Sequence, residues 1–288
     1  MESVVHGMVL ELGHVSRDIY DGHVVASVRP LWSYRAKVNT AALMGLLDEL
    51  ADRVRAALDG LGDWGPSGRR PGQYRSDVVA DAVALELLES AGIAVLSEES
   101  GLSPERSSGL VAVLDPVDGS TNAARGIPWF ATSVCILDDE GPLAALVANQ
   151  ANGTRYRALR GEPATRDGSP ISPRKTTEIS RSIIGLAGYP PKYFGWRQYR
   201  ALGAAALDLC AVADGTLDGY VDCGSRGHGV WDYMGGLLVC QQAGATLVDA
   251  TGRDLVVLEV SERRAPVAGA TKELCGALVR ARQAAYGR

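Results

Sequence analysis

Apolar side chains recur three or four positions apart between residues 41 and 58, which predicts an amphipathic helix capped by Asn39 or Thr40. The side chains expected on its buried face are Leu43, Leu46, Leu47, Leu50, Val54 and Leu58. A glycine- and proline-rich loop follows, and a second helical pattern begins at Ser76 or Asp77 and stops before Gly92.

Beyond residue 92 the pattern changes to short apolar runs bounded by turns, which predicts strands through about residue 170. From about residue 180, apolar runs alternate with helical patterns over 200–215 and 230–244, which is typical of an α/β layer. We therefore expect a mixed α/β (α+β) fold with three segments. Residues 1–38, whose alternation is weak, form an N-terminal extension of short strands or an extended arm; residues 39–155 form an α+β half; and residues 156–288 form an α/β half.

Bulk composition narrows the function. The 288 residues are 46% hydrophobic with a net charge of −5, so a nucleic-acid polymer or an anionic membrane is a poor partner. The sequence contains no segment of ~18 uninterrupted apolar residues, so no membrane span is predicted. The first residues do not resemble a secretion signal. Five cysteines without a CxxC pair predict reduced, buried thiols and a cytoplasmic protein. Only four histidines are present, three of them within the first 23 residues, so oxygen-bearing side chains must carry any chemistry.

The segment DPVDGSTN is the first candidate for that chemistry. Asp115 and Asp118 end an apolar strand three residues apart, and Gly119 permits a sharp turn. If a helix starts at Ser120, the following amides form an anion pocket beside acidic groups that suit a cation. Such a pairing predicts a metal-assisted phosphoryl site; a solvated acidic turn is the alternative.

Other acidic residues follow the same logic. Glu98 and Glu99 end another apolar run, and Asp232 stands at a predicted helix start after Trp231. Asp77 and Asp81 lie one helical turn apart, so either can face a site. Taken singly, these residues are equally typical of a surface, a helix cap or a solvated helix face.

In order, the segments SEES, DPVDGSTN, GIPWFATSVCI, YRALRGEPATRDGSPI, WDYMGG and QQAGA resemble the inositol monophosphatase family over about residues 40–275. This family belongs to the magnesium-dependent, lithium-sensitive sugar-phosphate phosphatases, which include archaeal-type fructose-1,6-bisphosphatase/inositol monophosphatases. The resemblance implies a layered αβαβα sandwich with the site between its halves, and a homodimer. Residues 1–38 have no counterpart in the typical family core.

The resemblance also implies two or three Mg²⁺ ions and their ligands. The first ion would be held by Glu98, Asp115, the Val117 carbonyl and Ser120. The second would be held by Asp115, Asp118 and Asp232. A third, weaker ion would involve Glu98 and Asp77, which fits the pattern better than Asp81. The expected catalytic residues are Glu98, Asp77 and Ser120.

Substrate would be bound by the remaining matched positions. The phosphate would lie against Gly119, Ser120 and Thr121. The rest of the substrate would contact Asp118, Asp232, Ala205 near Gly203, and Asp222. Arg226 either meets a second phosphate or is an ordinary exposed arginine, and His228 is more typical of a surface or packing residue than of a catalyst.

The implied function is hydrolysis of a phosphate monoester of a small polyol or sugar, resembling inositol phosphate, by two-metal activation of water. Alternative substrates are fructose 1,6-bisphosphate, histidinol phosphate, a 3′-phosphonucleotide or a pathway-specific sugar phosphate. An alternative of another class is a catalytically silent family member that binds or regulates a partner.

Overall fold

The computed structural model describes residues 19–20, 23–24, 39–104 and 108–287. The chain divides into two units, residues 1–38 and 39–288. In the first unit, β1 (Ile19–Tyr20) pairs with β2 (His23–Val24) in antiparallel fashion; the rest of the expected arm lies outside the described residues. Everything below concerns the second unit.

Two helices open this unit. α1 (Thr40–Asp59) begins where the side chain of Asn39 accepts a hydrogen bond from Ala42 N, at 3.1 Å, which confirms Asn39 as the cap. Its leucine face is buried as expected, with Leu46 only partly covered. α2 (Arg75–Ser90) begins one residue before the expected start.

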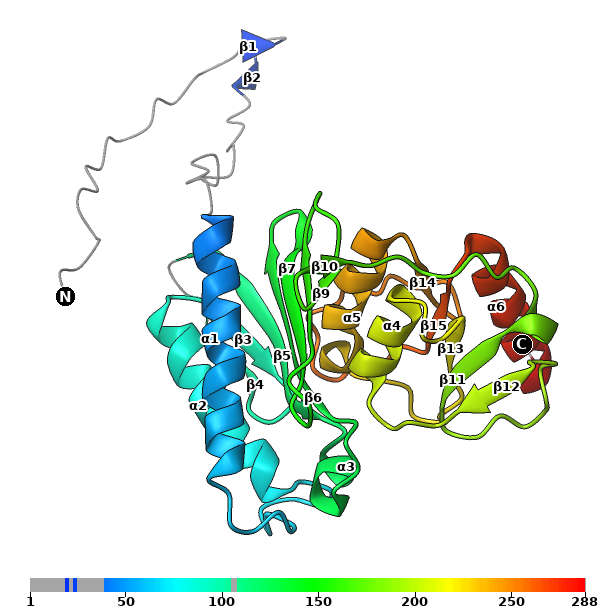
Figure 1. Ribbon diagram of the computed structural model, residues 1–288. Coiled ribbons are helices and arrows are strands. Elements are labelled where there is room, and N and C mark those ends of the chain that lie inside the picture. The colour runs from blue at the N-terminus through cyan, green and yellow to red at the C-terminus, as the bar shows by residue number, and fades with distance from the viewer. Residues whose placement is uncertain (1–18, 21–22, 25–38, 105–107, 288) are drawn as a thin grey trace. The chain divides into compact units, whose positions relative to one another are not determined.

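An eight-stranded sheet follows, in the order β10-β9-β8-β7-β6-β5-β3-β4 (Figure 1). Its strands are β3 (Ala94–Ser97), β4 (Gly101–Leu102), β5 (Val111–Asp118), β6 (Ala131–Asp138), β7 (Gly141–Asn149), β8 (Arg155–Leu159), β9 (Thr165–Arg166) and β10 (Ser169–Pro170). Neighbours pair antiparallel except β3 and β5, which are parallel. The parallel pair matters for function because it brings the carboxyl ends of two strands together.

A five-stranded sheet forms the second half, in the order β12-β11-β13-β15-β14. Its strands are β11 (Ile183–Ala187), β12 (Gln198–Arg200), β13 (Gly219–Asp222), β14 (Thr246–Asp249) and β15 (Pro266–Gly269). The remaining helices are α3 (Ser120–Arg125), the short 3₁₀ helix η1 (Ile179–Arg181), α4 (Ala205–Ala213), α5 (Val230–Ala243) and α6 (Lys272–Tyr286).

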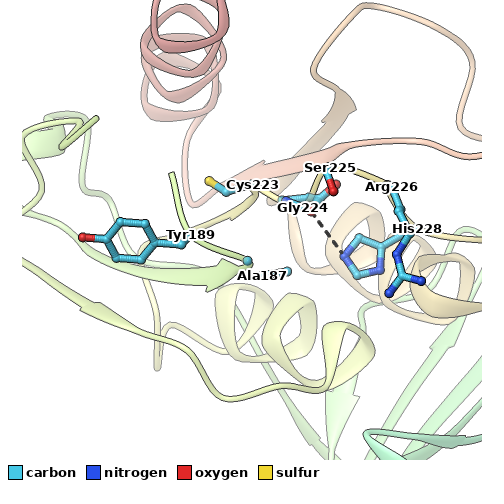
Figure 2. A pocket seen from close by; sticks show the side chains of 10 residues that line it. Ala187, Tyr189, Cys223, Gly224, Ser225, Arg226 and His228 are labelled. Carbon is cyan, nitrogen blue, oxygen red and sulfur yellow. Dashed lines mark hydrogen bonds and ion pairs between the residues drawn. The ribbon is translucent and has the colours of Figure 1, made fainter. Parts of the chain in front are cut away.

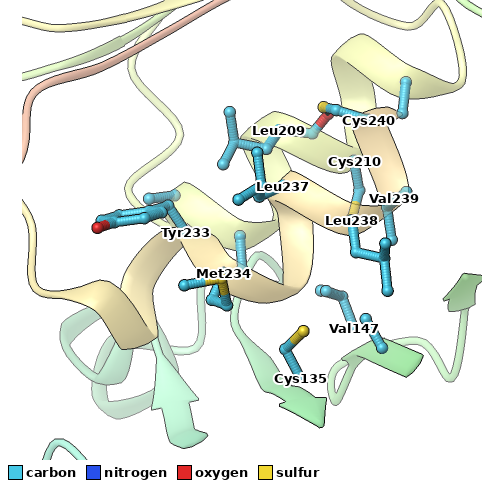
Figure 3. Close-up of a cluster of buried hydrophobic side chains, with 14 of the residues drawn as sticks. Cys135, Val147, Leu209, Cys210, Tyr233, Met234, Leu237, Leu238, Val239 and Cys240 are labelled. Atoms are coloured by element: carbon cyan, nitrogen blue, oxygen red, sulfur yellow. The ribbon is translucent and has the colours of Figure 1, made fainter. Parts of the chain in front are cut away.

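Three apolar cores join five layers. α1 and α2 pack on one face of the large sheet, α4 and α5 lie between the two sheets, and α6 covers the far face of the small sheet (Figure 1). Figure 3 shows the middle core, where Leu209 of α4 lies beside Leu237 of α5, above Val147 of β7. A Cβ at Gly236 would come within 2.7 Å of Leu209 Cβ, so a glycine allows the two helices this close approach. The expected αβαβα sandwich is confirmed.

The change of sheet comes later than the expected boundary after residue 155. β8 pairs with β7, so strands continue the large sheet to Pro170, and the small sheet begins at Ile183. All five cysteines are free and buried, as expected from their apolar surroundings. In the ranges that the structure describes, no helix has both the length and the apolar character needed to cross a membrane.

Candidate active site

The turn after β5 presents two aspartates at the end of a buried strand. The β5–β6 pairing shifts register between Asp115 and Asp118, around Pro116, which has no N–H to donate. Asp115 Oδ1 accepts from Val117 N at 3.0 Å. Gly119 then takes φ +86°, and a Cβ there would lie 3.1 Å from each of three atoms of neighbouring segments: Trp129 O, Gly203 O and Ala204 Cβ. Glycine is therefore required for the chain to turn into α3 at this point.

Glu98 reaches the same place from the neighbouring strand. It follows β3, which runs parallel to β5, and its N–H donates to Leu114 O at 3.1 Å. The adjacent Glu99 is occupied elsewhere, because Arg70 Nη2 donates to its carboxylate at 2.5 Å and Gln73 also bonds it. The two glutamates of SEES thus have different roles. The side chain of Glu99 binds the loop before α2, whereas the side chain of Glu98 is available to the site.

Two further aspartates stand in the first turns of helices. Asp77 Oδ2 accepts from Tyr74 N at 2.8 Å, at the start of α2. Asp232 Oδ2 accepts from Gly229 N at 2.9 Å, at the start of α5, and lies 3.0 Å from His228 Nδ1. Carboxylates are favoured at helix N-termini, so the first turn alone explains each residue locally. Whether each carboxylate belongs to the site therefore depends on the other acidic groups that lie close to it.

Three of these carboxylates converge. Glu98, Asp115 and Asp232 each offer an oxygen, and these oxygens lie within 4.8 Å of one another. Asp118 Oδ2 is turned toward α4, where it accepts from Ala206 N at 2.7 Å. A group of hard oxygen donors this close together suits a divalent cation such as Mg²⁺. The residues present therefore fit a metal.

Electrostatics support the same conclusion. Burial, followed by the charges of Asp232, Glu99 and the other nearby acids, raises the pKa of Glu98 to about 8. Burial also raises the pKa of Asp118 to about 7, although the hydrogen bond from Ala206 N opposes the shift. The pKa of fully buried Asp115 is raised well above its ordinary value, first by burial and then by Glu98. Positive charge at this point would relieve both effects.

The sequence matches the profile of the inositol monophosphatase family over residues 76–285. The chain belongs to the inositol monophosphatase family. It is 35% identical over 187 residues to the inositol-1-monophosphatase ImpA of Mycolicibacterium smegmatis, covering 59% of this chain and 66% of that relative, just under two thirds of its length. It is 30% identical over 206 residues to the fructose-1,6-bisphosphatase/inositol-1-monophosphatase of Methanocaldococcus jannaschii, covering 69% and 80% of the two chains.

The structure of the inositol monophosphatase from Anabaena superposes with a TM-score of 0.70 at 25% identity, covering 84% of this chain and 96% of that one. The family predicted from the motifs is thus confirmed. So is the predicted class of enzyme, because these two relatives are named inositol-1-monophosphatase and fructose-1,6-bisphosphatase/inositol-1-monophosphatase, and both names denote phosphoric monoester hydrolases.

In this family member, Asp77 and Asp81 face different surroundings. The charge of Asp77 contributes to the raised pKa of Glu98, whereas Asp81 accepts from Ser97 Oγ at 2.5 Å. Burial, with Glu99 next among the charges, raises the pKa of Asp77 to about 6. The structure thus brings Asp77 toward the acidic group and leaves Asp81 with serine hydroxyls; the role of Asp77 toward a third ion stays a prediction.

The predicted phosphate residues lie around the start of α3. Ser120 and Thr121 are its first residues, and Thr121 Oγ1 is 3.3 Å from the Tyr74 hydroxyl. Asn122, the last letter of DPVDGSTN, donates from Nδ2 to Trp129 O and Leu202 O, both at 2.7 Å. That side chain ties the turn to the segment before α4, and Tyr74 is a neighbour that the sequence did not single out.

Predicted substrate residues line two adjoining cavities. A cavity of about 250 Å³ is lined by Asp118, Gly203, Ala205, Asp208, Tyr220 and His228, among others. A second, of about 490 Å³, is lined by Asp222, Arg226 and His228 together with Tyr189 (Figure 2). In Figure 2 Arg226 and His228 lie side by side, with Tyr189 on the opposite side. Asp222 Oδ2 is buried and has no hydrogen-bond partner within the described residues.

His228 is the residue that the sequence undervalued. It lines both cavities, bonds Asp232 through Nδ1, and lies 2.9 Å from the Tyr220 hydroxyl through Nε2. Burial alone would lower its pKa, but the hydrogen bond to Asp232 and the nearby carboxylates raise it to about 9. Its spacing of four before Asp232 was the available signal, and only the fold shows that the intervening turn points the ring at the carboxylate.

Proposed function

We propose that this protein is a magnesium-dependent phosphatase that hydrolyses the phosphate monoester of a small polyol or sugar. One observation carries the proposal: Glu98, Asp115 and Asp232 present oxygens within 4.8 Å of one another beside the glycine turn that starts α3. Mutual repulsion makes such a group costly unless a cation neutralises it. Membership of a phosphatase family supports the assignment.

Glu98, Asp115, Asp118 and Asp232, with the Val117 carbonyl and Ser120, would hold two Mg²⁺ ions. Glu98 and Asp77 would hold a third, weaker ion, since the charge of Asp77 acts on Glu98. When bound, the cations supply positive charge that offsets the carboxylates and draws electron density from the phosphoryl oxygens. The backbone N–H groups of Gly119, Ser120 and Thr121 bind those oxygens. Glu98 and Ser120 orient the attacking water, and Glu98 accepts its proton as the water attacks phosphorus in line. The ester P–O bond opposite the water breaks, and the leaving oxygen takes up a proton from solvent, so that the products are the free alcohol and inorganic phosphate. No covalent phospho-enzyme is needed.

The alcohol part of the substrate would occupy the two cavities. Asp222 accepts a hydrogen bond from a substrate hydroxyl, which would satisfy its unpartnered Oδ2. Ala205, at the start of α4, lies against the same space and limits its depth. Arg226 borders the larger cavity, so it is available for a second phosphate if the substrate is a bisphosphate.

A phosphate-release assay tests the proposal. The protein is assayed with Mg²⁺ against inositol 1-phosphate, fructose 1,6-bisphosphate, histidinol phosphate, a 3′-phosphonucleotide and a generic aryl phosphate. We expect a polyol or sugar phosphate to be preferred and EDTA to abolish turnover. Inositol 1-phosphate turned over no faster than the aryl ester would remove it as the default substrate, and activity retained in Asp118→Asn would contradict the mechanism. No release from any monoester would favour a catalytically silent binding protein.

The homodimer expected from the family resemblance is tested separately by light scattering, which should give twice the mass of the chain. Sub-millimolar inhibition by Li⁺ is tested in the same phosphate-release assay, by titrating LiCl against NaCl at constant ionic strength.

A further inference from the structure

The backbone of His228 is held by two hydrogen bonds, one through its N–H and one through its carbonyl. Its N–H donates to Arg264 O at 2.7 Å, and its carbonyl accepts from Arg264 N at 2.9 Å, an isolated bridge that ends just before α5. Gly227 precedes it with φ +69°, where a Cβ would lie 2.7 Å from Arg264 O. The turn that carries the imidazole is therefore fixed by the fold and is not a free surface loop.

The imidazole contacts one particular oxygen of Asp232. Oδ2 accepts from Gly229 N at 2.9 Å and lies 3.0 Å from His228 Nδ1. An ionised carboxylate can only accept, so Nδ1 is the donor. Both protein donors thus use Oδ2, and within the described residues no hydrogen bond is formed to Oδ1. The arrangement leaves Oδ1 for a ligand that carries positive charge.

The far side of the ring is also fixed. His228 Nε2 lies 2.9 Å from the hydroxyl of Tyr220, a side chain of β13 with no exposed surface. Asp222 Oδ1 is 3.8 Å from the same nitrogen, which is beyond hydrogen-bond distance. Tyr220 and Asp232 therefore hold the imidazole between them, and the ring has little freedom to turn.

Asp77 serves as a comparison, because it stands at a helix start like Asp232 but has no histidine bonded to its carboxylate. It has the same backbone bond at the start of its helix, from Tyr74 N, and its other hydrogen-bond partner within the described residues is Ser76 Oγ on the same turn, at 3.2 Å. It is not among the three carboxylates whose oxygens lie within 4.8 Å. Asp232 is among them, against the repulsion of Glu98 and Asp115. A donor behind Asp232 offsets that repulsion and keeps the carboxylate turned toward its neighbours.

We propose that His228 is a positioning residue for the cation site: it fixes the Asp232 carboxylate through Nδ1 and is itself fixed by Tyr220. This inference rests on the proposed function only in taking Asp232 as a ligand of Mg²⁺. Residues that orient metal ligands commonly change metal affinity by about 10–100-fold when they are removed. The effect is expected on cation binding, with substrate recognition left to Asp222 and its neighbours.

Three substitutions separate the two ring nitrogens. The amide nitrogen of Asn can stand near the place of Nδ1, that of Gln near the place of Nε2, and Ala offers neither. Binding of Mn²⁺ to the metal-free full-length protein is measured by calorimetry for His228→Asn, His228→Gln and His228→Ala. We expect His228→Ala and His228→Gln to weaken binding by about 10–100-fold, and His228→Asn to recover most of it.

Tyr220→Phe tests the second contact without removing the imidazole. It should weaken Mn²⁺ binding by a smaller factor, about threefold, because Nε2 loses one hydrogen bond while Nδ1 keeps its own. The matched control is Tyr156→Phe, which removes another mostly buried hydroxyl that donates to Asp214 at 2.9 Å, on β8. That control should bind Mn²⁺ as the unsubstituted protein does.

A steady-state measurement gives an independent readout. In His228→Ala the Mg²⁺ concentration for half-maximal rate should rise by about 10–100-fold. The substrate KM at saturating Mg²⁺ should rise by a smaller factor, because the ring also borders the two cavities. Unaltered Mn²⁺ affinity in His228→Ala, or equal losses in His228→Asn and His228→Ala, would overturn the positioning role. So would a change confined to substrate KM. If His228→Ala does not fold, His228→Asn, His228→Gln and Tyr220→Phe still decide the matter.

These outcomes are distinct from failure of the proposed function. An unsubstituted protein that binds neither Mn²⁺ nor Mg²⁺ and releases no phosphate refutes the phosphatase assignment itself. An unsubstituted protein that binds Mn²⁺ and turns over a monoester, with all three His228 variants unchanged, refutes only the role given to His228.

Discussion

The turn from β5 into α3 and the segment from Asp222 to Asp232 line the same site but are built differently. In the turn, the contacts that set the backbone path are local: Asp115 accepts from Val117 N two residues away, and Gly119 supplies the left-handed step. Asp118 and Asn122 then attach the turn to the chain around the start of α4. In the segment, the contacts are distant. Arg282 Nε donates to Asp222 O at 2.6 Å, and Arg264 pairs with His228. A motif with local contacts can be read from its letters; a segment held by remote residues cannot.

The difference is also one of redundancy. Both acids of the turn lie beside the start of α3, and the register shift at Pro116 fixes the positions of their carboxylates. No neighbouring residue of the turn could therefore take over the role of either acid. In the segment, three residues contribute to the site: Asp222, His228 and Asp232. The glycines between them are held in place by hydrogen bonds of the segment. We therefore expect substitutions in the turn to lower mainly kcat, and substitutions in the segment to weaken mainly the binding of substrate or cation.

The largest expected effect comes from Asp115→Asn compared with Asp222→Asn. Asp115→Asn should reduce kcat by at least about 100-fold, since even the loss of a group behind a metal ligand costs 10–100-fold. Asp222→Asn should raise substrate KM by about tenfold, the equivalent of one good hydrogen bond, with kcat less affected. Initial rates with saturating Mg²⁺ measure both. Equal losses of kcat in the two variants would erase the distinction between turn and segment.

The sequence predicted the turn well and the segment poorly, for this physical reason. The possible helix start at Ser120 followed from DPVDGSTN, whose geometry depends on proline, glycine and adjacent amides. The family match rested on this motif together with SEES, WDYMGG and the other ordered segments. Glu98 could be matched by motif, but its separation from Glu99 depends on Arg70, 29 residues away in sequence. The choice between Asp77 and Asp81 depends on which side of α2 meets Ser97, which periodicity alone does not determine.

A second, smaller effect is expected from the two left-handed glycines that bound α3. Gly126→Ala, at φ +70° with nothing within 4 Å of a Cβ, should cost about 1 kcal/mol in the free energy of unfolding. Gly119→Ala, at φ +86°, adds contacts at 3.1 Å to two carbonyl oxygens and Ala204 Cβ, so it should cost more stability.

Gly119→Ala should also lower kcat, because the turn that aims Asp118 must move. Urea unfolding gives the stabilities, and phosphate release gives the rates. Gly126→Ala is the control for backbone strain alone. The comparison fails if both variants lose the same stability and the same activity.

A moderate effect is expected on the pH dependence of stability without metal. Burial is the first cause of raised pKa values, which go from 4.5 to about 8 at Glu98 and from 3.8 to about 7 at Asp118. Between these limits the unfolded chain has released protons that the folded protein still holds, so the stability contributed by these two carboxyls falls as pH rises and levels off above about pH 8. His228, whose pKa is raised from 6.5 to about 9, extends the fall toward pH 9. The Tm in EDTA should fall across this range by about 2–4 °C for each kcal/mol lost.

Saturating Mg²⁺ should remove most of that fall, because the cation favours the ionised carboxylates. Asp118→Asn should flatten the profile in EDTA more than Asp222→Asn does, since the charge of Asp232 adds to burial at Asp118 whereas His228 opposes burial at Asp222. Scanning calorimetry over pH 5–9, with and without Mg²⁺, makes the measurement. A Tm that rises with pH in EDTA would contradict the sign.

The smallest expected effect belongs to Tyr74, whose phenol lies 3.3 Å from Thr121 Oγ1 across the entrance to the turn. Tyr74→Phe keeps the ring and the backbone N–H that bonds Asp77, and it removes one partly exposed hydrogen bond. Such bonds contribute about 0.5 kcal/mol, so the free energy of unfolding should fall by about that amount, substrate KM should rise by no more than about twofold, and kcat should stay unchanged. The turn is already held by the bond from Val117 N to Asp115 and by the bonds from Asn122 to Trp129 O and Leu202 O, so a contact from Tyr74 adds only a little. A tenfold loss of kcat in Tyr74→Phe would mean that the turn depends on the start of α2 as well.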